Sequence, residues 1–135
     1  MTSSMLSDEA RAVLGEKRFA VLATINADGT PHLSVMWYEL QGDEVLMNTK
    51  VGRVKEQNMR RDPRISICIE DDYNYISLSG TVHLIDEQDV AQADIRHLAE
   101  RYHNPERAEK MMQNMFAKEQ RVTMRMSIEK VLERI

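Results

Sequence analysis

Cysteine is almost absent from this sequence of 135 residues, in which Cys68 stands alone. A single thiol excludes an internal disulfide, and it also excludes the thiolate clusters that hold zinc or iron–sulfur groups. The histidines are also few: His32, His83, His97 and His103. Their spacing shows no pairing typical of metal ligands, so the sequence predicts no metal site.

Long apolar runs are absent as well. No stretch of about 18 apolar residues, the length that crosses a bilayer as a helix, occurs in the sequence. The N-terminal residues have neither the basic start nor the apolar core of a secretory signal. We therefore expect a cytoplasmic protein without a membrane partner. A chain of this size fits one domain, which we expect to span residues 1–135.

A basic excess is the third absence. The formal net charge of −4 disfavours a general nucleic-acid-binding surface, because such surfaces carry excess positive charge. Several basic side chains nevertheless gather within one short stretch of this acidic protein: Lys50, Arg53, Lys55, Arg60, Arg61 and Arg64. Only Glu56 and Asp62 offset them there, so the stretch predicts a small anionic ligand.

Alternation of apolar and polar residues predicts a mainly β protein. The expected strands are residues 19–25, 32–40, 45–49, 65–70, 73–85 and 121–128. Asp28-Gly29, between the first two strands, can adopt positive φ, which predicts a hairpin. Gly80, inside the long fifth strand, predicts a bulge or bend.

Four short helices are expected around these strands. The first occupies residues 6–14, with Ser7 as its N-cap, and the second occupies residues 53–61 and ends before a proline. The third follows Asp86, which lies three residues before another aspartate and resembles the start of a capping box. The fourth begins after Asn104, an N-cap residue followed by a first-turn proline.

The junction between the third strand and the second helix is the strongest local feature. The first backbone N–H groups of a helix have no intrahelical acceptors and lie at the positive end of its dipole, so they favour a phosphate. Thr49 could add a hydroxyl donor, and Arg53 and Lys55 could each add a charge-assisted hydrogen bond. The alternative is a solvated basic helix. Gly52 does not create a P-loop, because the required glycine and lysine spacing is missing.

The second strand carries an unusual set of side chains between His32 and Tyr38. A flat conjugated ring could lie against it, with main-chain groups bonding the ring's heteroatoms and Met36 or Trp37 covering its face. The alternative, which we favour for either residue taken alone, is that both belong to the ordinary core.

Four segments, taken in order, resemble the pyridoxamine 5′-phosphate oxidase-like split-barrel superfamily: residues 21–33, 36–38, 49–50 and 58–66. Their order and spacing are more specific than any one of them alone. The chain is most similar to the flavin/deazaflavin oxidoreductases of group B, whose members depend on or bind the deazaflavin F420. The similarity covers residues 8–132.

This resemblance implies a six-stranded split β-barrel with short peripheral helices, which forms a homodimer with cofactor sites at the dimer interface. The cofactor phosphate would meet Thr49, Lys50, Arg53 and Lys55. The cofactor ring would lie along Ser34, Val35, Met36, Trp37 and Asn48. Aromatic residues from the partner chain often complete the pocket, and Tyr73 and Tyr75 occupy the matching stretch. No catalytic side chain is implied, because the cofactor carries the hydride and the protein positions it.

The function implied by the resemblance is an oxidoreductase that passes a hydride between reduced F420 and a small conjugated acceptor. Two alternatives stay open: an FMN-dependent oxidoreductase or flavin reductase with the same fold, and a non-catalytic protein that carries F420. Pyridoxal phosphate synthesis is not expected, because true pyridoxamine phosphate oxidases have a longer chain with a C-terminal segment that binds the substrate phosphate.

Overall fold

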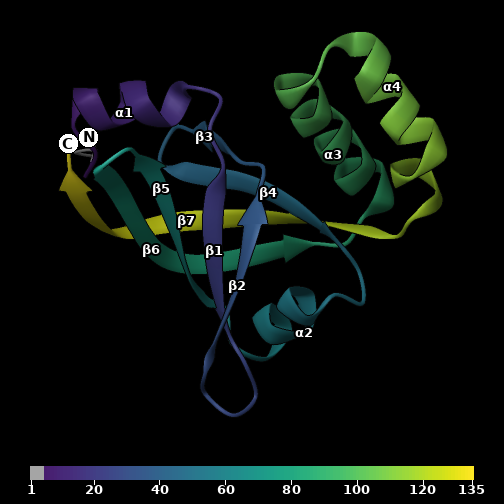
Figure 1. Cartoon of the computed structure of the whole chain (residues 1–135). Helices are drawn as coiled ribbons and strands as arrows, with labels where there is room; N and C mark the ends of the chain where they lie inside the picture. The colour runs from purple at the N-terminus through teal and green to yellow at the C-terminus, as the bar shows by residue number, and fades with distance from the viewer. Residues whose placement is uncertain (1–4) are drawn as a thin grey trace.

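The computed structural model describes residues 5–135, which form four α-helices, one short 3₁₀ helix and seven β-strands (Figure 1). The helices are α1 (Asp8–Gly15), α2 (Val54–Arg61), α3 (Gln88–Tyr102), α4 (Pro105–Asn114) and the 3₁₀ helix η1 (Phe116–Lys118). The strands are β1 (Ala20–Ile25), β2 (Pro31–Met36), β3 (Glu39–Gln41), β4 (Glu44–Lys50), β5 (Arg64–Asp71), β6 (Asn74–Ile85) and β7 (Arg121–Arg134). Within residues 5–135, no helix is long and apolar enough to cross a membrane.

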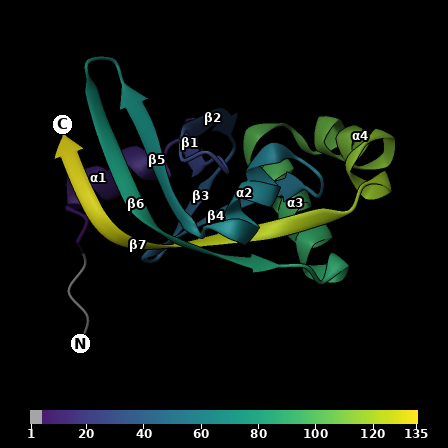
Figure 2. The ribbon, with the colours of Figure 1, turned by 90° about the horizontal axis from the view of Figure 1, so that it is seen from below.

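The strands pair antiparallel in one curled sheet with the order β2-β1-β5-β6-β7-β4-β3. Figures 1 and 2 show β6 and β7 extending side by side, in opposite directions, between the end of the molecule near α1 and the end that carries α3 and α4. β7 pairs with β6 along one side and with β4 along the other. The strand that comes last in the sequence therefore joins the two halves of the sheet, and the predicted mainly β architecture is confirmed.

A register shift in the β6–β7 ladder bends both strands. Ser79 pairs with Lys130 and Gly80 pairs with Ile128, so Glu129 is an extra residue on β7. At this bulge the two backbones approach so closely that a Cβ atom on Gly80 would lie 1.7 Å from the carbonyl oxygen of Ser127. The bulge predicted at Gly80 is confirmed, and only glycine leaves room for it.

Two apolar clusters form the core of the described residues. The larger one fills the curled sheet beneath α1 and includes Leu22 and Ile67. The smaller one packs Ile95 of α3 against Met112 of α4 and Phe116 of η1. The helical pair thus has a small core of its own beside the sheet, and the cleft described below lies along the border between the two clusters.

The strand expected at residues 32–40 is broken in the structure, so the sheet has seven strands rather than six. The break occurs at Trp37 and Tyr38, between β2 and β3. The backbone N–H of Tyr38 donates to the hydroxyl of Tyr102 at 3.1 Å, and its carbonyl oxygen accepts from Nε of Arg101 at 2.9 Å. Side chains of α3 therefore take the backbone groups that a continuous strand would give to its neighbour.

Local capping signals were good predictors for two helices and misleading for a third. Ser7 and Asn104 each cap a helix with the side chain, accepting from the N–H groups of Ala10 and Arg107. The expectation that Asp86 caps α3 is wrong, because the helix begins after Glu87 without a side-chain cap. The Asp86 carboxylate instead accepts hydrogen bonds from Arg60 at 2.6 and 3.2 Å.

The close approach at the bulge gives a stability test. Gly80→Ala would force the β7 backbone away from β6, so we expect it to lower the free energy of unfolding by about 2 kcal/mol or more. Gly15→Ala is the matched control, because a Cβ atom there meets nothing within 4 Å. The control should change stability by no more than about 1 kcal/mol. Urea unfolding measures both variants, and equal stability of the two would contradict the steric explanation.

Candidate functional site

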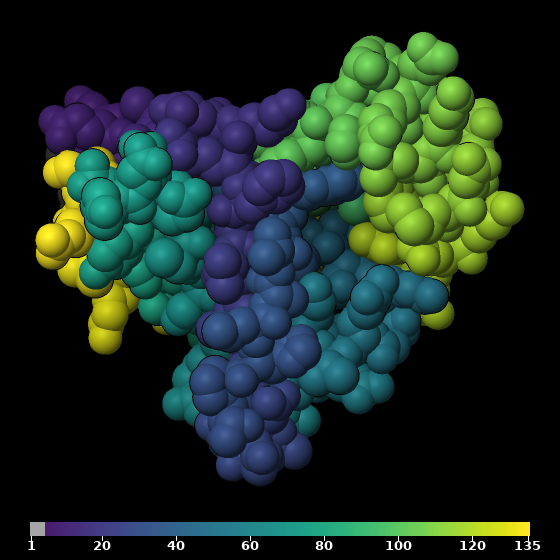
Figure 3. Space-filling model, viewed as in Figure 1, coloured from purple at the N-terminus to yellow at the C-terminus, as the bar shows by residue number. Residues whose placement is uncertain are grey.

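A cleft of about 360 Å³ lies between β2, the adjoining ends of β4 and β7, and the helices α3 and α4. Its lining residues are Val35, Met36, Trp37, Asn48, Thr49, Lys50, Arg53, Lys55, Ile95, Leu98, Met111, Met115, Phe116, Glu119 and Arg121. Figure 3 shows the surface hollowed between the blue strands and the green and yellow helical end of the molecule. One wall is therefore formed mainly by strands and the other mainly by helices. The basic residues of the lining lie at or just beyond the adjoining ends of β4 and β7.

Most residues predicted from the sequence to contact a cofactor line this one cleft. They are Val35, Met36, Trp37, Asn48, Thr49, Lys50, Arg53 and Lys55. Three predicted residues do not line it, namely Ser34, Tyr73 and Tyr75. The sheet brings the first group together because β2 and β4 both end at the border of the helical pair.

The turn from β4 into α2 is built by glycine and a buried carboxylate. Gly52 has a positive φ of 102°, and its N–H donates to Oε1 of Glu56 at 2.9 Å. Oε2 of Glu56 accepts from the guanidinium of Arg60. The N–H of Gly52 is therefore used inside the protein and does not face a ligand. Glu56 holds the turn that presents Lys50 and Arg53, a role that the sequence pattern did not reveal.

Three cations converge at one end of the cleft: Arg53, Lys55 and Arg121 form what we call the cation cluster. Burial lowers the pKa of the Lys55 ammonium below its usual value, and repulsion by Arg53 and Arg121 lowers it further. Nζ of Lys55 lies 3.2 Å from Sδ of Met36, and no carboxylate acts on its pKa. Within the cluster only Arg121 is paired with a carboxylate, Glu119, so the three cations keep a net positive charge, which favours an anionic ligand.

Arg121, at the start of β7, is the functional candidate that the sequence reading missed. It is only 7% exposed. Its Nε donates to Oδ1 of Asn48 at 3.0 Å, its Nη1 donates to Glu119 at 2.8 Å, and its guanidinium lies over the Phe116 ring at 4.9 Å. Burial lowers its pKa, while the hydrogen bond to Glu119 acts in the opposite direction. Nη2 finds no acceptor among residues 5–135, which leaves two N–H donors for a ligand in the cleft.

Asn48 acts through Arg121 rather than through a free amide. Its Nδ2 donates to the carbonyl oxygen of Ala91 on α3 at 2.9 Å, while its Oδ1 accepts from Arg121. The buried amide is therefore already bonded on both sides. In this geometry Asn48 ties α3 to β4 and fixes the plane of the guanidinium, while it lines the cleft as predicted from the sequence.

Ser34 occupies the core-facing side of β2, next to the cleft. It pairs with Leu22 in the β1–β2 ladder, and its hydroxyl oxygen is buried without a hydrogen-bond partner among the described residues. Buried hydroxyl groups almost always find a partner in a native protein. Because Ser34 faces the core and does not line the cleft, this unpaired hydroxyl is a buried feature of β2 rather than part of the cleft wall.

Trp37 combines the two alternatives that the sequence left open. Its ring stacks on Tyr102 with centroids 5.3 Å apart, and it meets the edge of Phe116 at 6.1 Å. It also lines the cleft. Trp37 is therefore both part of the packing between β2 and the helical pair and part of the wall that a ligand would touch.

Tyr73 and Tyr75 lie far from the cleft of their own chain. They belong to the hairpin tip between β5 and β6, where Tyr73 is 96% exposed. Figures 1 and 2 place this tip at the end of the molecule opposite α4. Within one chain they cannot contact a ligand in the cleft.

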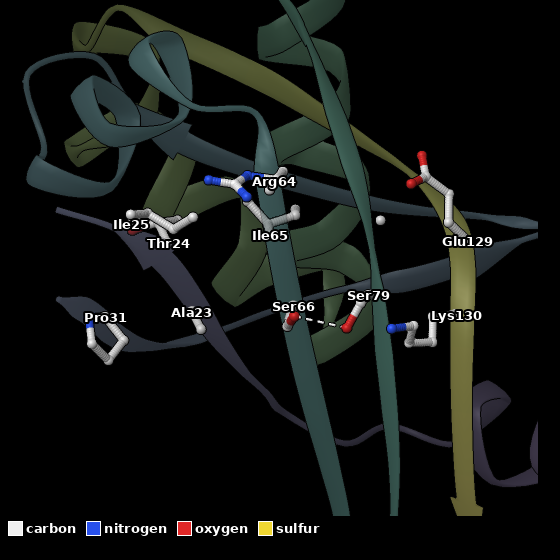
Figure 4. Close-up of a pocket in the computed structure, with 11 residues that line it drawn as sticks. Ala23, Thr24, Ile25, Pro31, Arg64, Ile65, Ser66, Ser79, Glu129 and Lys130 are labelled. Atoms are coloured by element: carbon white, nitrogen blue, oxygen red, sulfur yellow. Dashed lines mark hydrogen bonds between the residues drawn. The ribbon is translucent and has the colours of Figure 1, made fainter. Parts of the chain in front are cut away.

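A second hollow, of about 390 Å³, lies on the outer face of the sheet (Figure 4). Small residues of three adjacent strands line it, namely Ala23, Ser66, Ser79 and Gly80. The two serine hydroxyls bond each other at 2.8 Å, and Arg64 at the rim is paired with Asp62 at 2.7 Å. Because these polar groups already bond each other, we take the cleft with the cation cluster as the candidate site.

Comparison with known proteins agrees with this fold. An F420H(2)-dependent biliverdin reductase of Mycobacterium tuberculosis (strain CDC 1551 / Oshkosh) is 30% identical over 107 residues, which is 77% of each chain. The crystal structure of a conserved hypothetical protein from Mycobacterium tuberculosis is 29% identical, with a TM-score of 0.76 over 96% of this chain and 88% of that one. The structure of an F420 reductase has a TM-score of 0.81 at 21% identity, covering 94% of this chain and 98% of its own.

The match to a protein family extends over nearly all of the described residues. Residues 6–134 match the family described as pyridoxamine 5′-phosphate oxidase. The curled antiparallel sheet is the same fold that the superposed structures share. The resemblance inferred from the sequence is thereby confirmed, and the chain belongs to the pyridoxamine 5′-phosphate oxidase family.

Proposed function

We propose that this protein is an F420-dependent oxidoreductase that passes a hydride between the reduced cofactor and a small conjugated acceptor. The observation that carries the proposal is the cation cluster, Arg53, Lys55 and Arg121, at one end of a cleft whose wall is a strand. The relative named as an F420H(2)-dependent biliverdin reductase supports the choice of cofactor.

The residues present fit a phosphate-bearing ring cofactor. The cation cluster, together with Thr49 and Lys50, would hold the phosphate through charge-assisted hydrogen bonds. The main chain of residues 35–37 would bond the ring's edge, and Trp37 would contact its face. F420, when bound, supplies the hydride chemistry, so the side chains named here bind and orient rather than react.

The same residues would accept the phosphate of FMN, so titration of the purified protein with F420 and FMN in parallel is the deciding experiment. We expect tighter binding of F420, followed by acceptor-dependent oxidation of reduced F420 with a panel of enones, quinones and tetrapyrroles. Binding of FMN alone would favour a flavin enzyme. Saturable F420 binding without turnover of any acceptor would favour a carrier.

We further infer that a second copy of the chain covers the outer face of the sheet. Val35, Val21, Cys68, Ser77 and Leu132 stand in register across five strands on this face. The aliphatic members of the row are 40–66% exposed, and Leu33, one row away, is 62% exposed. Apolar side chains gathered in this way mark an interaction surface. A partner packed here would provide the only route by which Tyr73 and Tyr75 could approach a cleft.

Substitution of the cations tests the site. Arg53→Ala and Lys55→Ala should each weaken F420 binding by about tenfold to a hundredfold, because each removes a charge-assisted hydrogen bond worth roughly 1.5 to 3 kcal/mol. Calorimetric titration measures the affinity, and the emission of Trp37, the sole tryptophan, reports occupancy of the cleft. Arg107→Ala is the control, because Arg107 is exposed and does not line the cleft. Similar losses for all three variants would mean that general positive potential, rather than this site, attracts the cofactor.

The interface has its own test. Wild-type protein should show a mass near twice 15.7 kDa by light scattering. Leu33→Glu should shift that mass toward the monomer, because it places charge within the apolar surface. Val90→Glu changes an apolar residue that is 37% exposed on α3 and should leave the mass unaltered. A monomeric wild-type protein at micromolar concentration would rule out the inferred dimer.

A further inference from the structure

Glu119 is the only acidic residue among the described residues that line the cleft. Its Oε1 accepts from Nη1 of Arg121 at 2.8 Å, and its Oε2 lies 3.7 Å from Nζ of Lys50. The side chain is only 16% exposed. A carboxylate therefore lies between two of the cations that the proposed function assigns to the cofactor phosphate.

The backbone around Glu119 is fixed to α3 by two glutamine side chains. Nε2 of Gln92 donates to the carbonyl oxygens of Phe116 and Glu119, both at 2.9 Å. Gln88 donates to the carbonyl oxygen of Arg121 at 2.8 Å and accepts from its N–H at 3.0 Å. Because the chain is held on both sides, Glu119 cannot leave the cleft by a shift of the backbone, and its charge stays near any bound anion.

The two pairs that Glu119 makes differ in strength. The pair with Arg121 is short and buried on both sides, whereas Lys50 is 46% exposed and its ammonium lies farther away. A ligand that draws Lys50 away would therefore leave Glu119 on Arg121. The negative charge of Glu119 would then repel the bound anion, and the repulsion energy would be proportional to the anion's own charge.

We propose that Glu119 is a specificity-determining residue that selects among phosphates by charge. It disfavours a dianionic phosphate monoester more than a monoanionic phosphate diester. FMN is a monoester, with a second pKa of about 6 and a charge near −2 above it, whereas the phosphate of F420 is a diester that carries one negative charge. This inference rests on the proposed function, in which Lys50 and the cation cluster bind the cofactor phosphate.

The test removes the charge and keeps the shape. Glu119→Gln retains an oxygen that can accept from Arg121, and Glu109→Gln is the matched control, because Glu109 pairs with Arg96 outside the cleft. The ligands are F420, FMN, methyl phosphate as a dianion and dimethyl phosphate as a monoanion, all titrated at about pH 8.

Glu119→Gln should tighten binding of the monoanions by about threefold and of the dianions by about tenfold, since the repulsion that is removed doubles with the ligand's charge. The ratio of F420 to FMN affinity should fall accordingly. Glu109→Gln should change neither. An equal gain for monoanions and dianions would overturn the proposal, as would weaker binding of both, which would mean that Glu119 only positions Arg121.

The small phosphates separate this inference from the proposed function. One outcome is that Glu119→Gln binds methyl phosphate with a larger gain than dimethyl phosphate while neither F420 nor FMN binds. In that case the charge selection by Glu119 stands and the proposed function fails. If F420 binds and turns over but Glu119→Gln shows no larger gain for dianions, the proposed function stands and the inference fails. Thermal unfolding of the variant confirms that the comparison is made on folded protein.

Discussion

Between Ser79 and Gly80 the long ladder of β6 and β7 shifts register, and the shift lets one strand serve two surfaces. Before the bulge, β7 lies between β6 and β4 and delivers Arg121 to the cleft. After it, β7 pairs with β6 alone and presents Leu132 on the outer face. Both surfaces depend on a backbone approach that no side chain at position 80 would permit.

The cation cluster is held in place by packing, by hydrogen bonds and by a single ion pair, Arg121 with Glu119. Arg121 is fixed by Asn48, Glu119 and the Phe116 ring, and Lys55 is half-buried against Met36. Burial of the Lys55 ammonium, together with repulsion within the cluster, costs free energy in the ligand-free protein, as the lowered pKa of Lys55 indicates. An anion that binds here relieves this repulsion, so the site is ready for its ligand at some expense of stability.

Local sequence signals predicted the parts of the molecule that short-range interactions determine. The hairpin at Asp28-Gly29, the caps at Ser7 and Asn104, and the helix that begins after Arg53 all follow from residues within a few positions of one another. The bulge was predicted from Gly80 alone, although it forms against Ser127 and Glu129 of β7. The resemblance supplied the overall architecture and most of the residues that line the cleft.

The missed features depend on contacts between distant segments. Arg121 enters the cleft because β7 pairs with β4, a register set between residues more than 70 positions apart. The strand break at Tyr38 depends on Tyr102, and Asp86 does not cap α3 because Arg60 binds it. No periodicity in the sequence records such partners, because alternation specifies which face a residue occupies and not which strand lies beside it.

The position of β7 in the sheet also has a consequence for synthesis on the ribosome. It is the last strand in chain order, yet it lies between β6 and β4 near the middle of the sheet. Until it has been translated, β6 and β4 each present an unpaired edge, which is the kind of edge that recruits other chains. The nascent chain therefore depends on rapid capture of β7, and substitutions that slow this late pairing would favour aggregation even where the finished protein is stable.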